Sequence, residues 1–149
     1  MAARHRAREY ALQMLYQSEV GGLPMPEVAA HFWQREEVPD EVRRFAERLA
    51  LGTTGEVERI DALLRSGIDN WRLERLGTVD RSVLRMAVYE FLHEPSTPRI
   101  VVIDEAIEVA KRFGGEESGQ FVNGILDALR KRLDAAPPDG DPITNPSSH

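Results

Sequence analysis

Apolar positions in residues 79–133 recur at helical spacing in three successive segments. The middle segment places small and large apolar side chains at the i, i+3, i+4, i+7 positions of one helix face, with charged residues on the other sides. These apolar residues are Ile103, Ala106, Ile107, Ala110 and Phe113. Similar stripes occur in residues 83–92 and 121–129. Because the connections between the segments are short, we expect three helices packed as a bundle.

The first half of the chain also predicts three helices. The first runs from Arg4 to Val20, the second from about residue 26 to 37, and a long third helix from Asp40 to Gly67. Asp40 is a plausible N-cap for the third helix. Gly52 and Gly55 in its middle indicate either a close helix crossing or a kink. One or two further turns in residues 69–78 join the halves, which gives an all-α fold of about seven helices.

We expect one helical domain over residues 1–133, with subdomains of about 1–67 and 68–133. Residues 134–149 contain four of the nine prolines and no apolar period, which predicts a disordered acidic tail. The sequence has no cysteine, no secretory signal and no segment that could span a membrane. A cytoplasmic protein is therefore expected.

The net charge of −6 argues against nucleic-acid binding over the whole surface, because an acidic body repels phosphate. Residues 1–8, however, carry three arginines and no acid. We expect Arg4, Arg8 and His5 to project together from the exposed side of the first two helical turns. Two interpretations of this patch stay open: an RNA-binding site and a solubilising arm.

The sequence lacks the motifs of common active sites. Its four histidines are scattered, no glycine-rich loop has the form of a P-loop, and no serine lies in a G-x-S-x-G motif. Asp104, Glu108 and the basic pair that follows them are typical of an ion-pair ladder on a helix surface. We therefore expect neither enzymatic activity, nor a metal site, nor a cofactor.

Two features near the last helix allow more than one interpretation. Phe113 and Phe121 flank a GGEES turn, and each is either a core residue or a platform on which an RNA base stacks. Gly124 lies inside the last predicted helix, where close packing of a neighbouring helix explains a glycine without any ligand.

Three segments together resemble the NusB family of transcription antitermination factors. They are RxRAREYALQMLY at residues 4–16, VDRSVLRMAVYEFL at 79–92 and IDEAIEVAKRFGGEESGQFVNGILD at 103–127. The resemblance implies two three-helix bundles packed at an angle. It also implies a protein that binds single-stranded boxA RNA jointly with ribosomal protein NusE, in an antitermination complex with RNA polymerase that reads through ribosomal RNA operons.

The resemblance also assigns roles to individual positions. His5 stands where the family has an arginine, and Gln120 where a lysine is common. Positions implied in RNA binding are Arg4, His5, Arg6, Arg8, Tyr16, Glu117, Ser118, Gln120 and Phe121. Positions implied in NusE binding are Tyr16, Asp80 and, on the same predicted helix, Arg81 and Leu84.

Two other readings remain beside this one. The same fold occurs as the RNA-binding domain of ribosomal RNA cytosine methyltransferases, whose catalytic domain has no counterpart in this sequence. The chain could also be a helical scaffold without an RNA function. Some family members are expected to form homodimers through the arginine face, which would cover an RNA site.

Overall fold

The computed structural model describes residues 2–35, 37–67 and 70–135, and within these ranges the chain is all-α, as predicted. It contains eight α-helices and one short 3-10 turn, with no strand in the described ranges. The elements are α1 (Ala2–Gly21), α2 (Met25–Phe32), η1 (Trp33–Arg35), α3 (Asp40–Gly55), α4 (Val57–Gly67), α5 (Asn70–Arg75), α6 (Thr78–His93), α7 (Arg99–Gly114) and α8 (Glu116–Ala135). The tail expected to be disordered lies outside the described residues, except for residues 134 and 135, which end α8.

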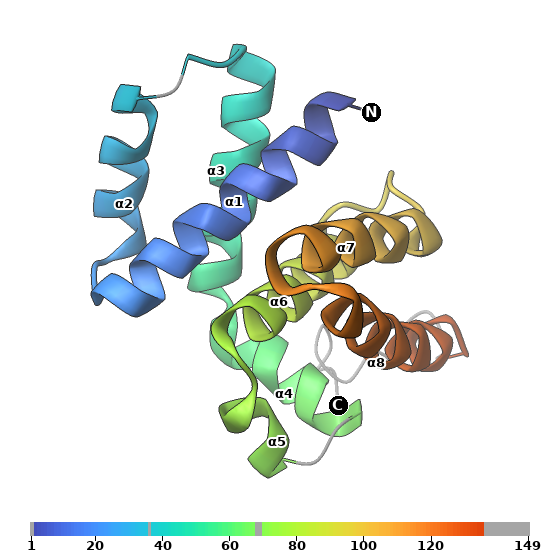
Figure 1. Cartoon of the computed structure of the whole chain (residues 1–149). Helices are drawn as coiled ribbons and strands as arrows, with labels where there is room; N and C mark the ends of the chain where they lie inside the picture. Colours follow the sequence, from blue (N-terminus) through green and yellow to red (C-terminus); the bar gives the residue numbers. More distant parts are fainter. Residues whose placement is uncertain (1, 36, 68–69, 136–149) are drawn as a thin grey trace, which may run out of the picture.

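The helices form two groups around one core (Figure 1). In the first group α1 packs against α2 and, more extensively, against α3. In the second group α6, α7 and α8 pack on one another, and α4 joins them through α6 and α8. The helix α6 contacts α1, α3, α4, α7 and α8. It is consequently buried on most of its circumference and forms the centre of the molecule.

The long helix predicted over residues 40–67 is two helices. It breaks at Glu56, whose backbone angles are φ −117° and ψ 24°. Hydrogen bonds still cross the break, because Glu56 N donates to Gly52 O and Ile60 N donates to Glu56 O. The bend directs α4 towards α6 and α8. Packing partners consequently change at Glu56, and the subdomain limit near residue 67 stays a prediction.

Prolines, and not acidic side chains, precede three of the helices. Pro24, Pro39 and Pro98 have extended backbone angles immediately before α2, α3 and α7. Their carbonyl groups accept the first helical hydrogen bonds, from Val28, Arg43 and Val102 at 3.1 Å each. None of these helices has a side-chain cap. The prediction that Asp40 is an N-cap is wrong, because Asp40 is already inside the helix.

Two glycines permit close helix approaches, and a third does not. A Cβ added to Gly52 would lie 2.3 Å from Cζ of Tyr89, so α3 crosses α6 closely at this point. A Cβ at Gly119 would lie 2.7 Å from Cγ of Lys111, between α8 and α7. Nothing lies within 4 Å of the corresponding position at Gly124. The expectation that Gly124 lies against a neighbouring helix is therefore wrong.

Substituting Gly52 tests the close crossing of α3 and α6. We expect Gly52→Ala to lower the free energy of unfolding by about 1–3 kcal/mol, because the new methyl group overlaps the buried ring of Tyr89. Gly55→Ala is the matched control, since it meets nothing within 4 Å and lies in the same helix. It should be neutral or stabilising by about 0.4–1 kcal/mol. Equal urea midpoints for the two variants would contradict the close crossing.

Candidate nucleic-acid interface

The basic residues of the N-terminal segment face different neighbours. Successive residues of an α-helix are separated by about 100°, so Arg4 and Arg6 lie about 200° apart around α1. Arg4 lies over the ring of Phe45 on α3 and donates to Thr97 Oγ1 at 3.3 Å. His5 faces α7, and Arg6 is exposed beside Tyr10. The sequence predicts that Arg4, His5 and Arg8 project together into solvent. Arg4 and Arg8 share the ring of Phe45, and His5 and Arg8 share Glu105, but these contacts hold the side chains against α3 and α7. The predicted exposed patch is therefore wrong.

Arg8 is a core residue. Only 3% of its surface is exposed. Its Nε and Nη2 donate to the two carboxylate oxygens of Glu90 on α6, at 2.8 and 2.9 Å. Burial disfavours the charged guanidinium, but the hydrogen bond and the charge of Glu90 outweigh this, so the pKa of Arg8 is raised. The expectation of an exposed Arg8 is wrong, and its side chain cannot reach RNA in this conformation.

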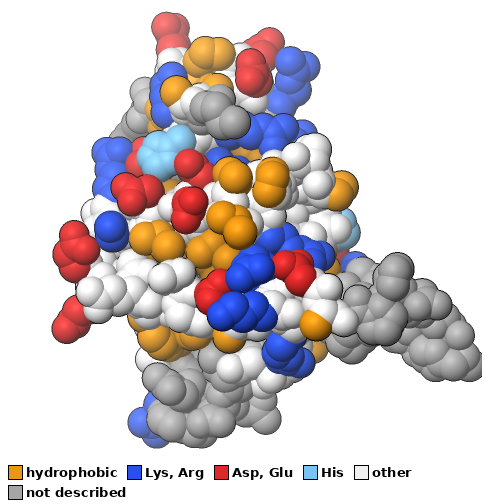
Figure 2. Space-filling model, turned by 90° about the vertical axis from the view of Figure 1, so that its right-hand side faces the viewer, with side chains coloured by type: hydrophobic (Ala, Val, Ile, Leu, Met, Phe, Trp, Pro, Cys, Tyr) orange, Lys and Arg blue, Asp and Glu red, His pale blue; other side chains and the backbone are white. Residues whose placement is uncertain are grey.

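Acidic side chains neutralise much of the face between α1 and α7. The His5 ring lies between Glu105 and Glu9, with Nδ1 2.7 Å from Glu105 Oε1 and Nε2 3.2 Å from Glu9 Oε2. Arg112 Nη1 donates to Glu9 Oε1 at 2.7 Å. In the predicted ladder on α7, Lys111 does contact Glu108, at 3.9 Å, whereas Arg112 pairs with α1. Positive and negative side chains consequently alternate on this side of the molecule (Figure 2).

The turn between α7 and α8 is shaped by Gly115 and closed by a hydrogen bond from the side chain of Ser118. Gly115 adopts φ 95°, a left-handed conformation that favours glycine. The hydroxyl of Ser118 donates to Gly114 O at 3.1 Å, while Glu117 and Gln120 are exposed. A Cβ at Gly114 would lie 3.4 Å from Val79, so the turn lies beside the start of α6.

Phe113 and Phe121 are both partly buried and pack against the core. The guanidinium of Arg112 lies 5.4 Å from the centroid of the Phe113 ring. Both rings therefore contribute to the core, and base stacking on either ring stays a prediction. Each ring also keeps some exposed surface beside the exposed Glu117 and Gln120.

Three of the four residues expected to bind a protein partner are exposed or partly exposed around the start of α6, and the fourth, Leu84, is buried. Tyr16 is 46% exposed on α1. One turn later, Glu19 accepts hydrogen bonds from Thr78 and Arg81, which brings this part of α1 to the first turn of α6, where Asp80 is half-buried. Leu84 is fully buried in the core. Its assignment to a partner surface is therefore wrong.

Arg81 has a structural role as well. Its Nη1 donates to the carbonyl oxygens of Leu76 and Leu73, at 2.5 and 3.4 Å. The side chain thus satisfies carbonyl groups at the end of α5 and is only partly exposed.

Sequence reasoning missed two surface features. Val20 and Leu23 are exposed apolar residues that follow Tyr16 at helical spacing, which was visible in the sequence. Arg44 and Arg48 of α3 lie beside Arg4, and their i, i+4 spacing was the available signal. Among the described residues, no group of three or more histidine and acidic side chains is placed to hold a metal ion. No helix in this part of the chain is long and apolar enough to cross a membrane.

Comparisons with known proteins agree with one another. The NusB family model matches residues 5–131. The "Transcription antitermination protein NusB" of Sorangium cellulosum is 45% identical over 133 residues, which are 89% of this chain and 95% of that protein. The solved T. maritima NusB has a TM-score of 0.78 and 40% identity, over 86% of this chain and 90% of the other.

A second solved structure is a complex of antitermination factors NusB and NusE with double-stranded RNA. The matched chain has a TM-score of 0.79 and 27% identity, over 89% of this chain and 98% of that chain.

Substituting Arg8 tests its structural role. We expect Arg8→Met to lower the free energy of unfolding by about 3–5 kcal/mol, because it leaves the carboxylate of Glu90 buried without its partner. The double variant Arg8→Met, Glu90→Met removes both charges and should recover most of that loss, since apolar pairs often replace buried ion pairs at little cost. Urea unfolding at neutral pH measures both. If the double variant is as unstable as the single one, the ion pair is not the cause.

Proposed function

Since the chain belongs to the NusB family, we propose that it acts in transcription antitermination by binding boxA RNA together with ribosomal protein NusE. The observation that carries this proposal is the similarity, over 89% of this chain, to a NusB chain solved with NusE and RNA. In the proposed function, the complex joins RNA polymerase in the cytoplasm and promotes read-through of ribosomal RNA operons.

The surface around the start of α6 supports a protein partner. Tyr16, Val20 and Leu23 expose apolar area on and after the end of α1. Two acidic groups lie beside them: half-buried Asp80, and Glu19, which is paired with Arg81 and Arg85 inside the chain. Asp80 therefore offers the acidic group that complements a basic protein such as a ribosomal protein. Exposed apolar side chains bordered by charges are typical of protein interfaces. We assign NusE to this surface, with Tyr16, Asp80 and Arg81 in contact and Leu84 behind them in the core.

The charges on the RNA-facing side support a requirement for NusE. Phosphate neutralisation supplies most of the affinity of a protein for nucleic acid. On the α1–α7 side, His5 and Arg112 are already paired with acids, and Arg8 is buried. Arg6 is exposed, and among the described residues its side chain contacts Tyr10, through a long hydrogen bond of 3.4 Å and with the ring centroid 5.9 Å from the guanidinium carbon. RNA binding by this chain alone should therefore be weak, and a basic partner should extend the positive surface.

The turn at residues 114–121 is the second proposed RNA contact. Glu117, Ser118, Gln120 and Phe121 occur together there and lie next to the first turn of α6. Ser118 and Gln120 offer neutral hydrogen-bonding groups, and Phe121 offers part of a ring. This composition favours contacts to bases over contacts to phosphates.

Fluorescence anisotropy tests the proposed function. A labelled boxA single strand, a scrambled strand and a boxA duplex are titrated with the protein, with and without NusE, at two salt concentrations. We expect boxA to bind at least about tenfold more tightly when NusE is present, with affinity falling as salt rises. Equal affinity with and without NusE would contradict joint binding. No binding under any condition would favour the helical scaffold.

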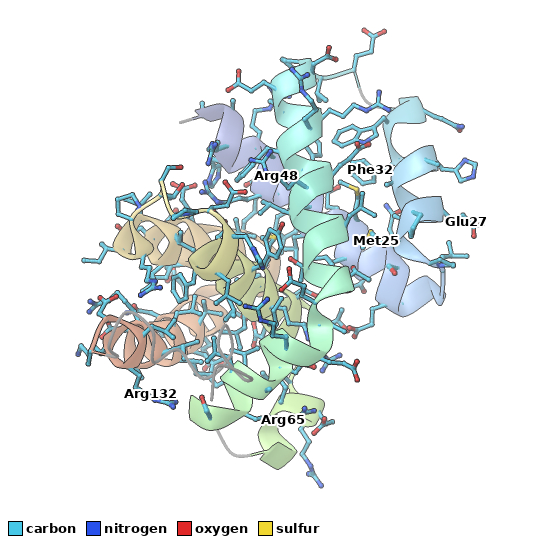
Figure 3. All side chains as sticks on the ribbon, turned by 180° about the vertical axis from the view of Figure 1, so that it is seen from behind. Met25, Glu27, Phe32, Arg48, Arg65 and Arg132 are labelled. Atoms are coloured by element: carbon cyan, nitrogen blue, oxygen red, sulfur yellow. The ribbon has the colours of Figure 1, made fainter. Side chains whose placement is uncertain are left out.

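Arg6→Gln tests the RNA contact within the same assay. It should weaken boxA binding by the NusE complex by about threefold to tenfold, because it removes an exposed cation without breaking an ion pair. Arg132→Gln is the matched control. Arg132 donates to Ser66 Oγ beside the end of α4 and lies far from the N-terminal turns of α1 (Figure 3). Equal losses in both variants would indicate general electrostatic attraction.

Sedimentation of the free protein shows whether it forms a homodimer, the state that would cover the arginine face.

A further inference from the structure

A hollow of about 190 Å³ lies between the first turn of α1 and the N-terminal half of α3. It is lined by Ala3, Arg4, Glu41, Arg44, Phe45 and Arg48. Three of these six residues are arginines, and they come from two helices. Figure 3 shows Arg48 projecting from α3 beside the N-terminal turns of α1. The hollow is outside the two segments in which RNA contacts are proposed, apart from Arg4.

The ring of Phe45 holds two of the arginines in place. Its face lies 4.3 Å from the guanidinium carbon of Arg4 and 5.0 Å from that of Arg48, measured to the ring centroid. The ring itself is buried, and a guanidinium over an aromatic face is attracted by the negative charge of that face. Arg4 and Arg48 are thereby positioned side by side, although both keep exposed surface.

The charges around the hollow do not balance. Arg48 donates to both carboxylate oxygens of Glu94, at 2.8 and 3.4 Å, and Arg4 lies 3.7 Å from the same carboxylate. One buried acid is therefore shared by two guanidiniums. Within the described part of the chain, exposed Arg44 has no ion pair or side-chain hydrogen bond. Glu41 is the one acid among the residues that line the hollow, and Glu94 lies behind them. Three positive groups thus face two negative ones, and no described residue accepts a hydrogen bond from the guanidinium of Arg44.

We infer that this hollow binds a backbone phosphate of the RNA, with Arg44 as its principal donor and Arg4 and Arg48 beside it. A phosphodiester group has two charged oxygens that can accept hydrogen bonds from more than one guanidinium. RNA is favoured over an acidic protein because Arg6, the proposed RNA contact, lies only two residues from Arg4 on the first turns of α1. Arg6 is on the opposite side of α1, so the proposed strand passes around the N-terminal end of this helix to reach the hollow. The inference thus rests on the proposed function and extends the RNA path onto α3.

The test compares two neighbouring arginines of α3. Arg44→Gln removes the unpaired guanidinium, and Arg43→Gln is the matched control. Arg43 lies one residue earlier on the same helix, pairs with Glu47 and faces the ring of Trp33. Both variants lose one positive charge from an exposed position of the same helix. Arg43→Gln also removes a half-exposed ion pair with Glu47, which is worth little in stability. Each is titrated with the boxA strand in the presence of NusE at several salt concentrations.

We expect Arg44→Gln to weaken RNA binding by about threefold to tenfold for boxA and scrambled strands alike, because a phosphate contact is not sequence-specific. The magnitude of the slope of log affinity against log salt concentration should decrease by about 0.7, because one phosphate contact is lost. Arg43→Gln should bind like the wild type. Unfolding midpoints of both variants should match the wild type, which keeps a folding defect separate from a binding defect.

Other outcomes would overturn the inference. Equal losses in the two variants, or wild-type binding by Arg44→Gln, would show that the hollow is not a phosphate site while leaving the proposed function intact. A loss of NusE affinity without a loss of RNA affinity in the complex would show that the hollow docks a protein. If the wild type binds no RNA with NusE present, the proposed function fails, and the inference fails with it.

Discussion

The ion pair between Arg8 and Glu90 fixes how the two groups of helices meet. Glu90 lies in α6, which is enclosed by five other helices, so its carboxylate cannot be solvated by water and requires a partner. Arg8 supplies two hydrogen bonds from α1, and it also approaches Glu105 of α7. This geometry sets the rotation of α1 about its own axis. Arg4 is consequently directed to α3, His5 to α7 and Arg6 to solvent.

The helices with regular apolar stripes could be predicted well from the sequence. The apolar faces of α6, α7 and α8 pack mainly on one another. Because the connections between these helices are short, few other packing partners are within reach. The break at Glu56 was less accessible, because both α3 and α4 continue a single apolar period across it. Its direction depends on which helices cover α4. Pro24, Pro39 and Pro98 stand immediately before α2, α3 and α7, so the sequence did indicate where these helices begin. At α3, the expected N-cap at Asp40 took the place of this indication.

The candidate site was harder to predict than the fold, because periodicity does not distinguish a charged side chain on the surface from a paired one in the core. Arg8 lies close in sequence to exposed Arg6, and its acidic partner is 82 residues away. A family resemblance transfers positions, but it does not say which side of a helix each position occupies. Leu84 shows the same limit, because it neighbours a partly exposed residue on a helix that is otherwise mostly buried. Arg44 became a candidate only when α3 was placed beside α1.

The long sequence separation of the contacts made by α1 has a consequence for synthesis on the ribosome. α1 is translated before α6 and α7, and Glu90 and Glu105, the acids that neutralise Arg8, follow it by 82 and 97 residues. Until α6 and α7 have emerged, part of the apolar face of α1 and the guanidinium of Arg8 lack their final cover. Exposed apolar surface of this kind makes nascent chains prone to non-native association. The side-chain arrangement on α1 is therefore completed only after α6 and α7 have been made.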